Sequence, residues 1–357
     1  MRNYLYNLAT DASDGIIAAF MKALLLALSW LYGLTVRVLI LMRSSRPKKA
    51  GCPVISVGNI TVGGTGKTSL VEFICRYLKD NGHKPAVITR GYKKPRLAGR
   101  LPQSAYETMG DEPYMLQRNL RDVLVIVDAD RLRGARQAHD YYGVDTIVLD
   151  DGFQQWGIKK DLDIAAIDAT NPFGNRNMLP RGILREPLSS LRRADILVLT
   201  KTNLNPDSQD IKDFLSRINP GALIVESAHQ PLGCYFLGRE KEMLATDFLK
   251  GKTLALFSGI ADPDSFESLV LSLGGQVGLS FTFDDHHRYT KDDIEGIVAA
   301  SRRKGISVVV TTEKDSVRLR SVCPAAGNIA ILVLRIELKV THNEKRLLDR
   351  LLGIYRS

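Results

Sequence analysis

The sequence predicts two α/β/α domains with largely parallel sheets and a hydrophobic helix at the N-terminus. Short apolar runs that fit strands buried on both faces recur along the chain, and amphipathic segments separate many of them. A length of 357 residues is enough for two domains, each with its own core. Hydrophobic residues make up 45% and charged residues 25% of the chain, which excludes disordered, collagen-like and polytopic membrane proteins.

The N-terminal segment, residues 1–45, is expected to form a membrane-associating helix. Residues 16–42 carry only two charges, Lys22 and Arg37, and as a helix they are long enough to cross a bilayer. These charges share one narrow stripe with Ser29 and Gly33, and basic residues follow, which favours a helix lying at the membrane interface. Packing on protein and a single membrane span are the alternatives, and in each case the body of the chain is cytoplasmic.

The rest of the chain divides into two predicted domains, 46–235 and 236–357, joined by a short hinge. Apolar runs predict strands of the first domain at 53–58, 85–90, 124–128, 146–151, 163–168 and 195–200. A second series gives strands at 253–260, 276–283, 307–312 and 329–336, with helices at 263–273, at 291–304 and at the C-terminal end. The boundary falls within 225–250.

A phosphate-binding loop follows the first of these strands. The segment ends in Gly66-Lys67-Thr68 and opens an amphipathic helix, so backbone N–H groups and the helix N-terminus can hold an anion. Lys67 is placed to reach the β- and γ-phosphates, and the Thr68 hydroxyl to coordinate Mg²⁺. The strict motif requires glycine where this chain has Thr61. The predicted nucleotide-binding residues are Thr61, Val62, Gly63, Gly64, Thr65, Gly66, Lys67 and Thr68.

An acidic pair at a strand end is the candidate metal site. Asp150 and Asp151 follow four apolar residues, the form expected of the second motif of a nucleotide-hydrolysing or phosphate-transferring enzyme. An aspartate pair that caps a turn before Gly152 is the alternative, and two other predicted strands also end in aspartate.

Short motifs occur in a fixed order along most of the chain. They are VGNITVGGTGKT, RGY (90–92), GDEP (110–113), DADR (128–131), LDDGFQ (149–154), LPRGILREP (179–187), DDHHRYT (284–290) and TTEKDSVRL (311–319). Taken together, these motifs closely resemble the tetraacyldisaccharide 4′-kinases, the lipid A kinases of Gram-negative bacteria. The similarity keeps its order from about residue 50 to about residue 320, and Thr61 is what this family shows.

The resemblance implies transfer of the ATP γ-phosphate to the 4′-hydroxyl of a tetraacylated glucosamine disaccharide 1-phosphate, with Mg²⁺. It implies a base, Asp111, paired with His286, and active-site positions at Arg131 and at the Arg185–Glu186 pair. Asp150, Asp151 and Glu186 join Thr68 as implied metal ligands. The implied partners are the glycolipid and the cytoplasmic face of the inner membrane, which a peripheral or monotopic helix binds, with no nucleic acid and no obligate protein partner.

The implied base is chemically sensible, since a sugar hydroxyl that attacks a phosphate needs a positioned proton acceptor. From the residues alone, however, Gly-Asp-Glu-Pro is also a good helix start, and His286 has a second histidine beside it. We expect Asp111 in the first domain and His286 in the second, so that the pair forms only when the domains close.

The net charge of +10 leaves other classes of anionic partner to consider. Much of the charge lies in two stretches, 81–106 and 176–193, which are either solvated loops or surfaces for anionic headgroups and a substrate phosphate. A regulatory GTPase would need an N-K-x-D motif, and this chain has Thr200-Lys201-Thr202-Asn203. A nucleic-acid-dependent ATPase would need a basic face with interleaved aromatics, which the sequence lacks.

Overall fold

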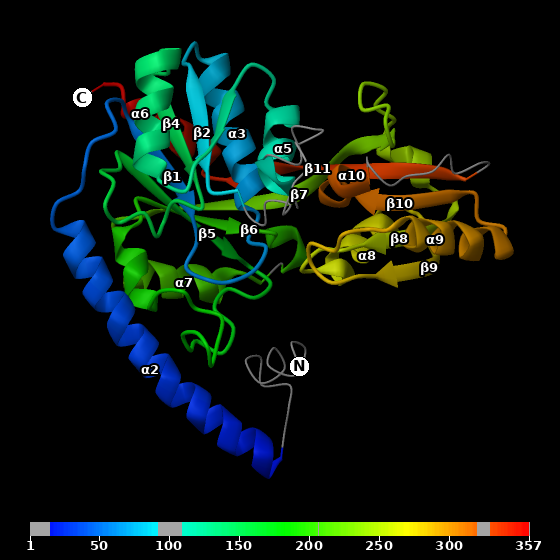
Figure 1. Cartoon of the computed structure of the whole chain (residues 1–357), viewed down its shortest axis with the longest axis horizontal. Coiled ribbons are helices and arrows are strands. Elements are labelled where there is room, and N and C mark those ends of the chain that lie inside the picture. The colour runs from blue at the N-terminus through cyan, green and yellow to red at the C-terminus, as the bar shows by residue number, and fades with distance from the viewer. Residues whose placement is uncertain (1–14, 92–108, 206, 320–328, 357) are drawn as a thin grey trace, which may run out of the picture. The chain divides into compact units, whose positions relative to one another are not determined.

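The computed structural model describes residues 15–91, 109–205, 207–319 and 329–356. Contacts between Cα atoms divide the chain into two compact units. Unit 1 takes the described residues of Met1–Arg90, Leu120–Ala228 and Leu338–Ser357, and unit 2 takes those of Gly91–Asn119 and His229–Glu337. Each unit is an α/β body with parallel strand pairs, so the predicted fold class is confirmed (Figure 1).

Unit 1 is built on a parallel sheet with the strand order β3-β2-β4-β1-β5-β6-β7. Its central strands are buried along their whole length because helices cover both faces. The strands are β1 (Val54–Gly58), β2 (Pro85–Thr89), β3 (Leu124–Val127), β4 (Thr146–Asp150), β5 (Leu162–Asp168), β6 (Ile196–Thr200) and β7 (Leu223–Phe236). The helices are α2 (Ile16–Ser44), α3 (Lys67–Asp80), α6 (Arg131–Tyr142), α7 (Gln209–Ile218) and α11 (Glu344–Gly353), with short 3₁₀ turns η1 (Leu188–Arg193) and η2 (Thr202–Leu204).

Successive side chains of a strand point to opposite faces of this sheet, so the residues on each face show which helices cover it. Val54 and Leu149 pack with Ala135 and Ala138 of α6, and Ala165 and Leu197 pack with Leu215 of α7. The register aligns Gly58 with Ala165, so these clusters lie on one face. Helix α3 contacts β1, β2 and β4, and α11 packs on α3.

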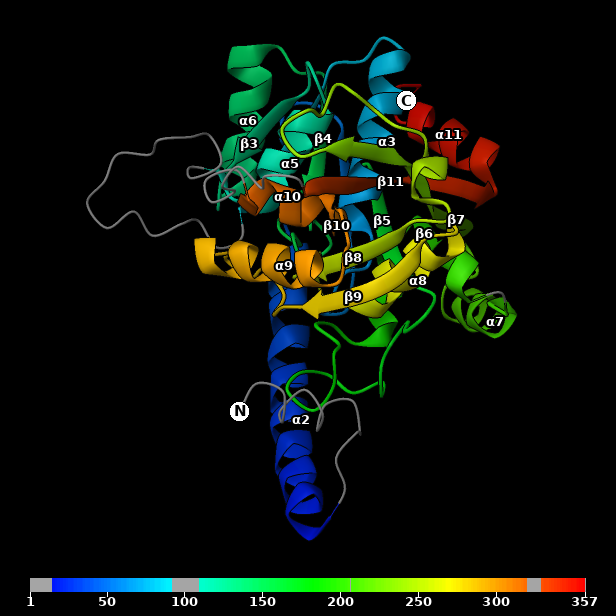
Figure 2. The same ribbon diagram turned by 90° about the vertical axis from the view of Figure 1, so that its right-hand side faces the viewer.

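Unit 2 has the parallel strand order β11-β10-β8-β9. Its strands are β8 (Thr253–Ser258), β9 (Gln276–Thr282), β10 (Val308–Thr312) and β11 (Ala330–His342), and its helices are α5 (Asp111–Asn119), α8 (Pro263–Ser272), α9 (Lys291–Arg303) and α10 (Glu313–Leu319), with the 3₁₀ turn η3 (Thr246–Leu249). Leu254 and Leu256 pack against α8, whereas the alternate residues Ala255 and Phe257 pack against α9 (Figure 2). Helix α9 starts with a capping box between Thr290 and Asp293.

The unit boundaries differ from the predicted domains 46–235 and 236–357 in three ways. The described residues of 91–119 belong to unit 2, because α5 packs on α10. Residues 338–357 belong to unit 1, where Tyr355 stacks on His83 with ring centroids 3.6 Å apart. The expected hinge region contains β7, a strand that starts in unit 1 and ends in unit 2.

Candidate functional site

The phosphate loop connects β1 to α3, and its glycines adopt the backbone that the loop requires. Gly66 has φ 74° and Gly63 has φ 125°, in the region that other residues rarely enter. Open space surrounds Gly63 and Gly64 where a Cβ would stand. Helix α3 starts at Lys67, so the first N–H groups of the helix have no acceptor within the helix itself. The predicted residues 61–68 therefore form a cradle that fits a phosphate chain.

A second segment, residues 183–185, holds this loop in position through backbone hydrogen bonds. The Val62 N–H donates to the Ile183 carbonyl at 2.8 Å, and the Arg185 N–H donates to the Ile60 carbonyl at 2.7 Å. Thr61 and Leu184 form an isolated antiparallel bridge. Residues 183–185 thus fix the position of the loop, and they bring the Arg185 side chain next to it.

Lys67 lies between an amide and a carboxylate. Its ammonium donates to Asn59 Oδ1 at 3.0 Å and is 3.5 Å from Asp151 Oδ1. Arg185 Nη1 donates to both oxygens of Asp151, at 2.9 and 3.1 Å. Burial works to raise the pKa of Asp151, but the charges of Lys67 and Arg185 outweigh it and lower that pKa. The Asp151 carboxylate therefore stays ionised and holds both cations beside the loop.

Asp150 ends β4 in a different environment. Its side chain is buried, and Oδ2 accepts a hydrogen bond from the Thr89 hydroxyl at 3.0 Å. Hard carboxylate and hydroxyl oxygens, such as those of Asp150 and Thr68, are the ligands that Mg²⁺ prefers. The described residues contain no group of three or more His, Cys, Asp or Glu side chains that could hold a metal ion. This donor set suits Mg²⁺, which usually shares one or two carboxylates with substrate phosphates.

Arg131 starts α6, where Asp130 caps the helix. It is buried, and its Nη1 donates to the carbonyls of Asp128 and Ala129 at 3.1 and 3.3 Å. Its Nε–H is a buried donor for which the described residues supply no hydrogen-bond acceptor. Burial lowers the pKa of Arg131, while the charge of Asp150 acts to raise it. A buried cation with an unused donor fits the binding of an anion.

Glu186 has an environment that the sequence analysis did not foresee. Its side chain is fully buried, with Oε1 accepting from Gln154 Nε2 at 2.9 Å and from Trp156 Nε1 at 3.2 Å. Oε2 accepts from Arg193 Nη2 at 2.9 Å. Both oxygens are thus engaged by protein donors. This arrangement supports a role for Glu186 in stabilising the Arg185 segment, and the metal-ligand role that the resemblance implies stays a prediction.

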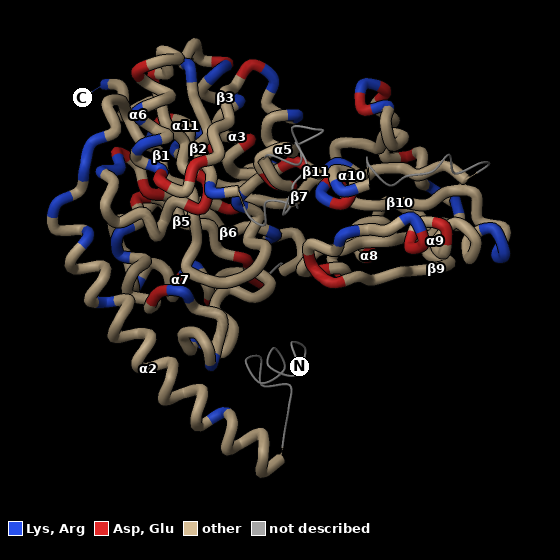
Figure 3. The backbone as a smooth tube through the Cα atoms, viewed as in Figure 1, with Lys and Arg blue, Asp and Glu red and all other residues tan. Residues whose placement is uncertain are grey.

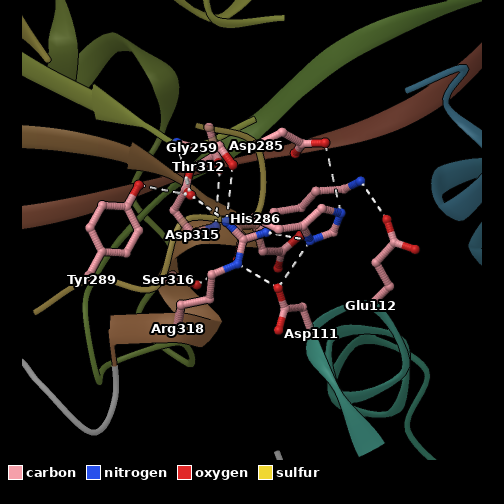
Figure 4. A network of polar contacts seen from close by, with 12 residues as sticks. Asp111, Glu112, Gly259, Asp285, His286, Tyr289, Thr312, Asp315, Ser316 and Arg318 are labelled. Carbon is pink, nitrogen blue, oxygen red and sulfur yellow. Dashed lines mark hydrogen bonds and ion pairs between the residues drawn. The ribbon is translucent and has the colours of Figure 1, made fainter. Parts of the chain in front are cut away.

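Asp111 and His286 lie together within unit 2, with Asp111 Oδ2 and His286 Nδ1 3.3 Å apart (Figure 4). Asp111 is the first residue of α5, and His286 has a left-handed backbone with φ 61°. Its N–H donates to the Gly259 carbonyl at 3.0 Å. The expectation that the pair joins residues of two domains is wrong, because α5 belongs to unit 2.

Two charged side chains beside this pair were missed by reasoning from the sequence. Arg318 donates to Asp111 Oδ2 at 2.5 Å, and the buried Asp315 accepts from Arg318 at 3.1 Å. Burial works to raise the pKa of Asp111, but the contact with the His286 ring and the charge of Arg318 lower it to about 2. An acid and an arginine three residues apart directly after an apolar strand were the available signal, within the motif TTEKDSVRL.

Helix α2 contacts the nucleotide side of unit 1 through a stripe of small and polar residues. Ser29 Oγ donates to the Met178 carbonyl at 2.5 Å, and Tyr32 Oη donates to the Arg185 carbonyl at 3.1 Å. A Cβ on Gly33 would lie 3.1 Å from Met178 Sδ. Part of the polar stripe predicted on this helix therefore contacts protein, whereas Arg37 of that stripe is exposed.

Most of the remaining surface of α2 is apolar and exposed. Trp30 is 75%, Leu34 59% and Leu41 72% exposed. The helix is long and apolar enough to cross a membrane by length and composition, and the exposed residues that follow are basic at Arg43, Arg46, Lys48 and Lys49 (Figure 3). The finding is consistent with membrane association.

Of the two basic stretches found in the sequence, 176–193 lies within the described residues and most of 81–106 does not. In 176–193, Arg185 and Arg193 pair with carboxylates, and Arg176 lies 5.2 Å from the ring centre of Phe214. Arg185 and Arg193 are therefore partly buried structural members of unit 1, whereas Arg176 is exposed. Most basic residues of 81–106, among them Lys93, Lys94, Arg96 and Arg100, lie outside the described residues.

Comparisons with known proteins agree with the geometry. The family model described as tetraacyldisaccharide-1-P 4′-kinase (LpxK) matches residues 21–355. The tetraacyldisaccharide 4′-kinase of Anaeromyxobacter dehalogenans (strain 2CP-C) is 38% identical over 81% of this chain and 78% of its own length. That of Halothermothrix orenii is 34% identical over 96% of this chain and 95% of its own.

A solved structure is similar over nearly the whole fold. The crystal structure of LpxK from Aquifex aeolicus in complex with ATP superposes with a TM-score of 0.74 at 29% identity, over 94% of this chain and 99% of that one. The family match spans the phosphate loop, the acidic pair and the Asp111–His286 contact. The chain therefore belongs to the tetraacyldisaccharide 4′-kinase family.

Proposed function

We propose that this chain is an ATP-dependent lipid kinase of lipid A biosynthesis. It transfers the ATP γ-phosphate to the 4′-hydroxyl of a tetraacylated glucosamine disaccharide 1-phosphate. The observation that carries the proposal is the phosphate cradle of residues 61–68 with Lys67 and Arg185 held beside it by the ionised Asp151. Family membership supplies the acceptor, and the ATP bound by the Aquifex aeolicus relative supports the donor.

The nucleotide is bound by unit 1 through the N–H groups of the cradle. Lys67 and Arg131 neutralise charge on the phosphoryl oxygens, since loose phosphoryl transfer depends mainly on positioning and electrostatics. Thr68 and Asp150 would hold Mg²⁺, and the ion would neutralise phosphate charge, while the adjacent Asp151 holds Lys67 and Arg185 beside the loop. We leave Glu186 out of this set because protein donors engage both of its oxygens.

The acceptor hydroxyl loses its proton to the Asp111–His286 pair. As the new O–P bond forms and the bond to the β-phosphate oxygen breaks, the hydroxyl proton needs an acceptor. Asp111 is ionised throughout the physiological pH range because its pKa is about 2. It can therefore accept a hydrogen bond from the hydroxyl and orient it, and it takes the proton late in the transfer.

The acyl chains of such an acceptor place the reaction at a membrane. We assign α2 to the cytoplasmic face of the inner membrane, bound peripherally or monotopically through its exposed apolar residues. The basic residues that follow it attract anionic headgroups. The partners are then the glycolipid and the membrane surface, with no nucleic acid and no obligate protein.

The test is transfer of labelled γ-phosphate to the tetraacyldisaccharide 1-phosphate by the full chain in mixed micelles. We expect product only with ATP, Mg²⁺ and the glycolipid, and we expect Lys67→Ala to lose it. GTP in place of ATP and added nucleic acid are the comparison reactions. Turnover that needs nucleic acid or GTP, or that proceeds equally without glycolipid, would overturn the proposal.

A further inference from the structure

Arg318 makes contacts on three sides of its guanidinium in unit 2, and the reaction proposed above assigns it no role. Its side chain is 2% exposed. Nε donates to Asp111 Oδ2 at 2.5 Å, and Nη2 lies 3.2 Å from His286 Nδ1. Nη1 donates to the Gly259 carbonyl at 3.0 Å and to Asp315 Oδ1 at 3.1 Å (Figure 4). The planar guanidinium of Arg318, called the fork below, thus contacts both members of the Asp111–His286 pair.

Asp315 holds the far side of this fork in place. Its Oδ1 also accepts from Tyr289 Oη at 3.0 Å and from the Gly259 N–H at 3.1 Å, and its Oδ2 accepts from Thr312 Oγ1 at 2.6 Å. The carboxylate is fully buried and has hydrogen bonds from three elements. A fully bonded buried network has one arrangement, so Arg318 cannot turn away without leaving charges unpaired.

Gly259 links the fork to the histidine. Its carbonyl accepts from Arg318 Nη1 and also from the His286 backbone N–H. A Cβ at Gly259 would lie 3.1 Å from the Asp284 carbonyl and from Tyr289 Oη, closer than most Cβ contacts. The left-handed backbone of His286 is therefore anchored to the same carbonyl as Arg318, which fixes the distance between ring and guanidinium.

The contact with the ring decides where the histidine proton lies. A guanidinium has only donors, so Nδ1 of a neutral His286 accepts from Arg318 and the ring proton is on Nε2. The same Nδ1 then does not donate to Asp111, and the two acceptor atoms, 3.3 Å apart, are held together by the Arg318 guanidinium that donates to both. Asp111 Oδ2 takes the Arg318 Nε–H instead, which leaves the carboxylate ionised.

The geometry points to Arg318 as the positioning residue of the phosphoryl-transfer site, which fixes the Asp111 carboxylate and sets the Nε2–H tautomer of His286. This inference rests on the proposed function for its meaning in the reaction. The hydroxyl proton then meets a carboxylate that is held ionised and aimed, rather than one that is free to rotate or to share a proton with the imidazole.

The charged and titratable groups that face the pair come from three elements. They are Arg318, Asp315 and Lys314 from α10, Glu112 from α5, and Asp285 and Tyr289 from the segment between β9 and α9. Arg318 is the cation among them that contacts both members of the pair. Its removal raises the pKa of Asp111 toward the ordinary range, because the guanidinium charge and its hydrogen bond both lower that pKa.

The first experiment compares Arg318→Lys and Arg318→Gln with wild type in kcat, in the KM for ATP and in the pH profile of kcat. We expect kcat to fall about 10²-fold or more in both, with the KM for ATP within about threefold. The acidic limb of the kcat profile should move to higher pH in Arg318→Gln, and less in Arg318→Lys, which keeps a charge but not the fork. Arg335→Lys is the matched control, since Arg335 Nε is 3.7 Å from Glu313 in the same unit.

Chemical rescue of activity by an added cation distinguishes a loss of positioning from a loss of folding. Arg318→Ala should regain activity about tenfold or more with added methylguanidinium and not with equal tetramethylammonium, because only the former can donate to Asp111 and to the imidazole. Wild-type kcat in Arg318→Gln, an unmoved acidic limb, or equal rescue by both cations would overturn the inference.

A second measurement needs no activity. Nitrogen-15 spectra of the full wild-type chain in micelles, with His286→Gln to assign the signals, should report His286 as the Nε2–H tautomer. An Nδ1–H tautomer would overturn the inference even if transfer activity is present. Absence of glycolipid phosphorylation by wild type would instead contradict the proposed function, and the tautomer would still test Arg318.

Discussion

Asp150 and Asp151 are neighbours in the chain, and their carboxylates have opposite environments. Asp150 ends β4, is buried and accepts from the Thr89 hydroxyl. Asp151 has a left-handed backbone with φ 52°, which turns its side chain to Lys67 and Arg185. One residue of the pair is therefore suited to a metal ion and the other to fixing cations.

This difference predicts distinct losses for the two amides. Asp150→Asn should lower kcat about 10²-fold or more and raise the Mg²⁺ concentration needed for half-maximal rate, because a neutral amide is a weaker Mg²⁺ ligand. Asp151→Asn should lower kcat with little change in the Mg²⁺ requirement. Mg²⁺ titrations of transfer rate make the comparison, and identical Mg²⁺ curves for the two variants would contradict it.

Removal of the imidazole should affect the reaction without affecting nucleotide binding. We expect His286→Ala to lower kcat about 10²-fold and to leave the Kd of ATP unchanged, because the phosphate cradle belongs to unit 1 and His286 to unit 2. His287→Ala is the matched control, since His287 pairs with Asp293 at 3.1 Å and does not contact Asp111 in the described network. Equal activity of His286→Ala and wild type would contradict the proposed role of the Asp111–His286 pair.

The pKa of Asp111 predicts a dependence of stability on pH. Its pKa of about 2 in the folded chain is below the ordinary 3.8, so the ionised carboxylate stabilises the fold above pH 3.8. Asp111→Asn should therefore lower the free energy of unfolding at pH 5 to 7 relative to wild type, and the gap should close as the pH falls from about 4 to about 2. Urea titrations at several pH values measure it, with the exposed Glu295→Gln as control. A gap that is constant down to pH 2 would contradict the assignment.

The exposed face of α2 predicts how the chain binds lipid. Trp30→Gln, Leu34→Gln and Leu41→Gln combined should lower partition onto anionic vesicles at least about 10²-fold, since each apolar side chain contributes about 1.5–3 kcal/mol when buried. Ser29→Ala, on the stripe that contacts protein, should leave partition nearly unchanged. Sedimentation with vesicles measures both, and equal losses would mean that the exposed face is not the lipid-binding one.

The segment that follows α11 predicts a stability effect confined to unit 1. Tyr355 stacks on His83, and its hydroxyl is 2.6 Å from Thr146 Oγ1. Tyr355→Ala should lower the free energy of unfolding by about 2 kcal/mol through the lost stacking and hydrogen bond. Tyr355→Phe keeps the stack and should lose about 1 kcal/mol. Urea unfolding distinguishes them, and equal losses would assign the whole effect to the hydroxyl.

Much of unit 1 could be predicted from local sequence. A strand, a glycine-rich turn and an amphipathic helix in succession constrain one another, so β1, the cradle and α3 followed from residues 53–80. The acidic end of β4 was visible for the same reason, because an apolar run fixes where the strand ends.

Contacts between distant segments could not be predicted in the same way. That α5 pairs with α10, and α11 with α3, depends on surfaces that no local pattern encodes. The buried state of Glu186 depends on Gln154 and Trp156, some thirty residues earlier in the chain. Arg318 was likewise hidden, since a basic residue in a short helix is usually at the surface and this one is 2% exposed.

The segments of unit 2 are inserted between segments of unit 1 in the sequence, and this order has a consequence for synthesis on the ribosome. Helix α3 carries Lys67 and Thr68, and it packs against α11 at the other end of the chain. Unit 1 therefore lacks one of the helices that pack on α3 until α11 has emerged, whereas every described segment of unit 2 has been translated by Glu337. Unit 2 can therefore complete its core before unit 1 does. A nascent chain released before α11 is made would carry the phosphate loop in an incompletely packed unit 1.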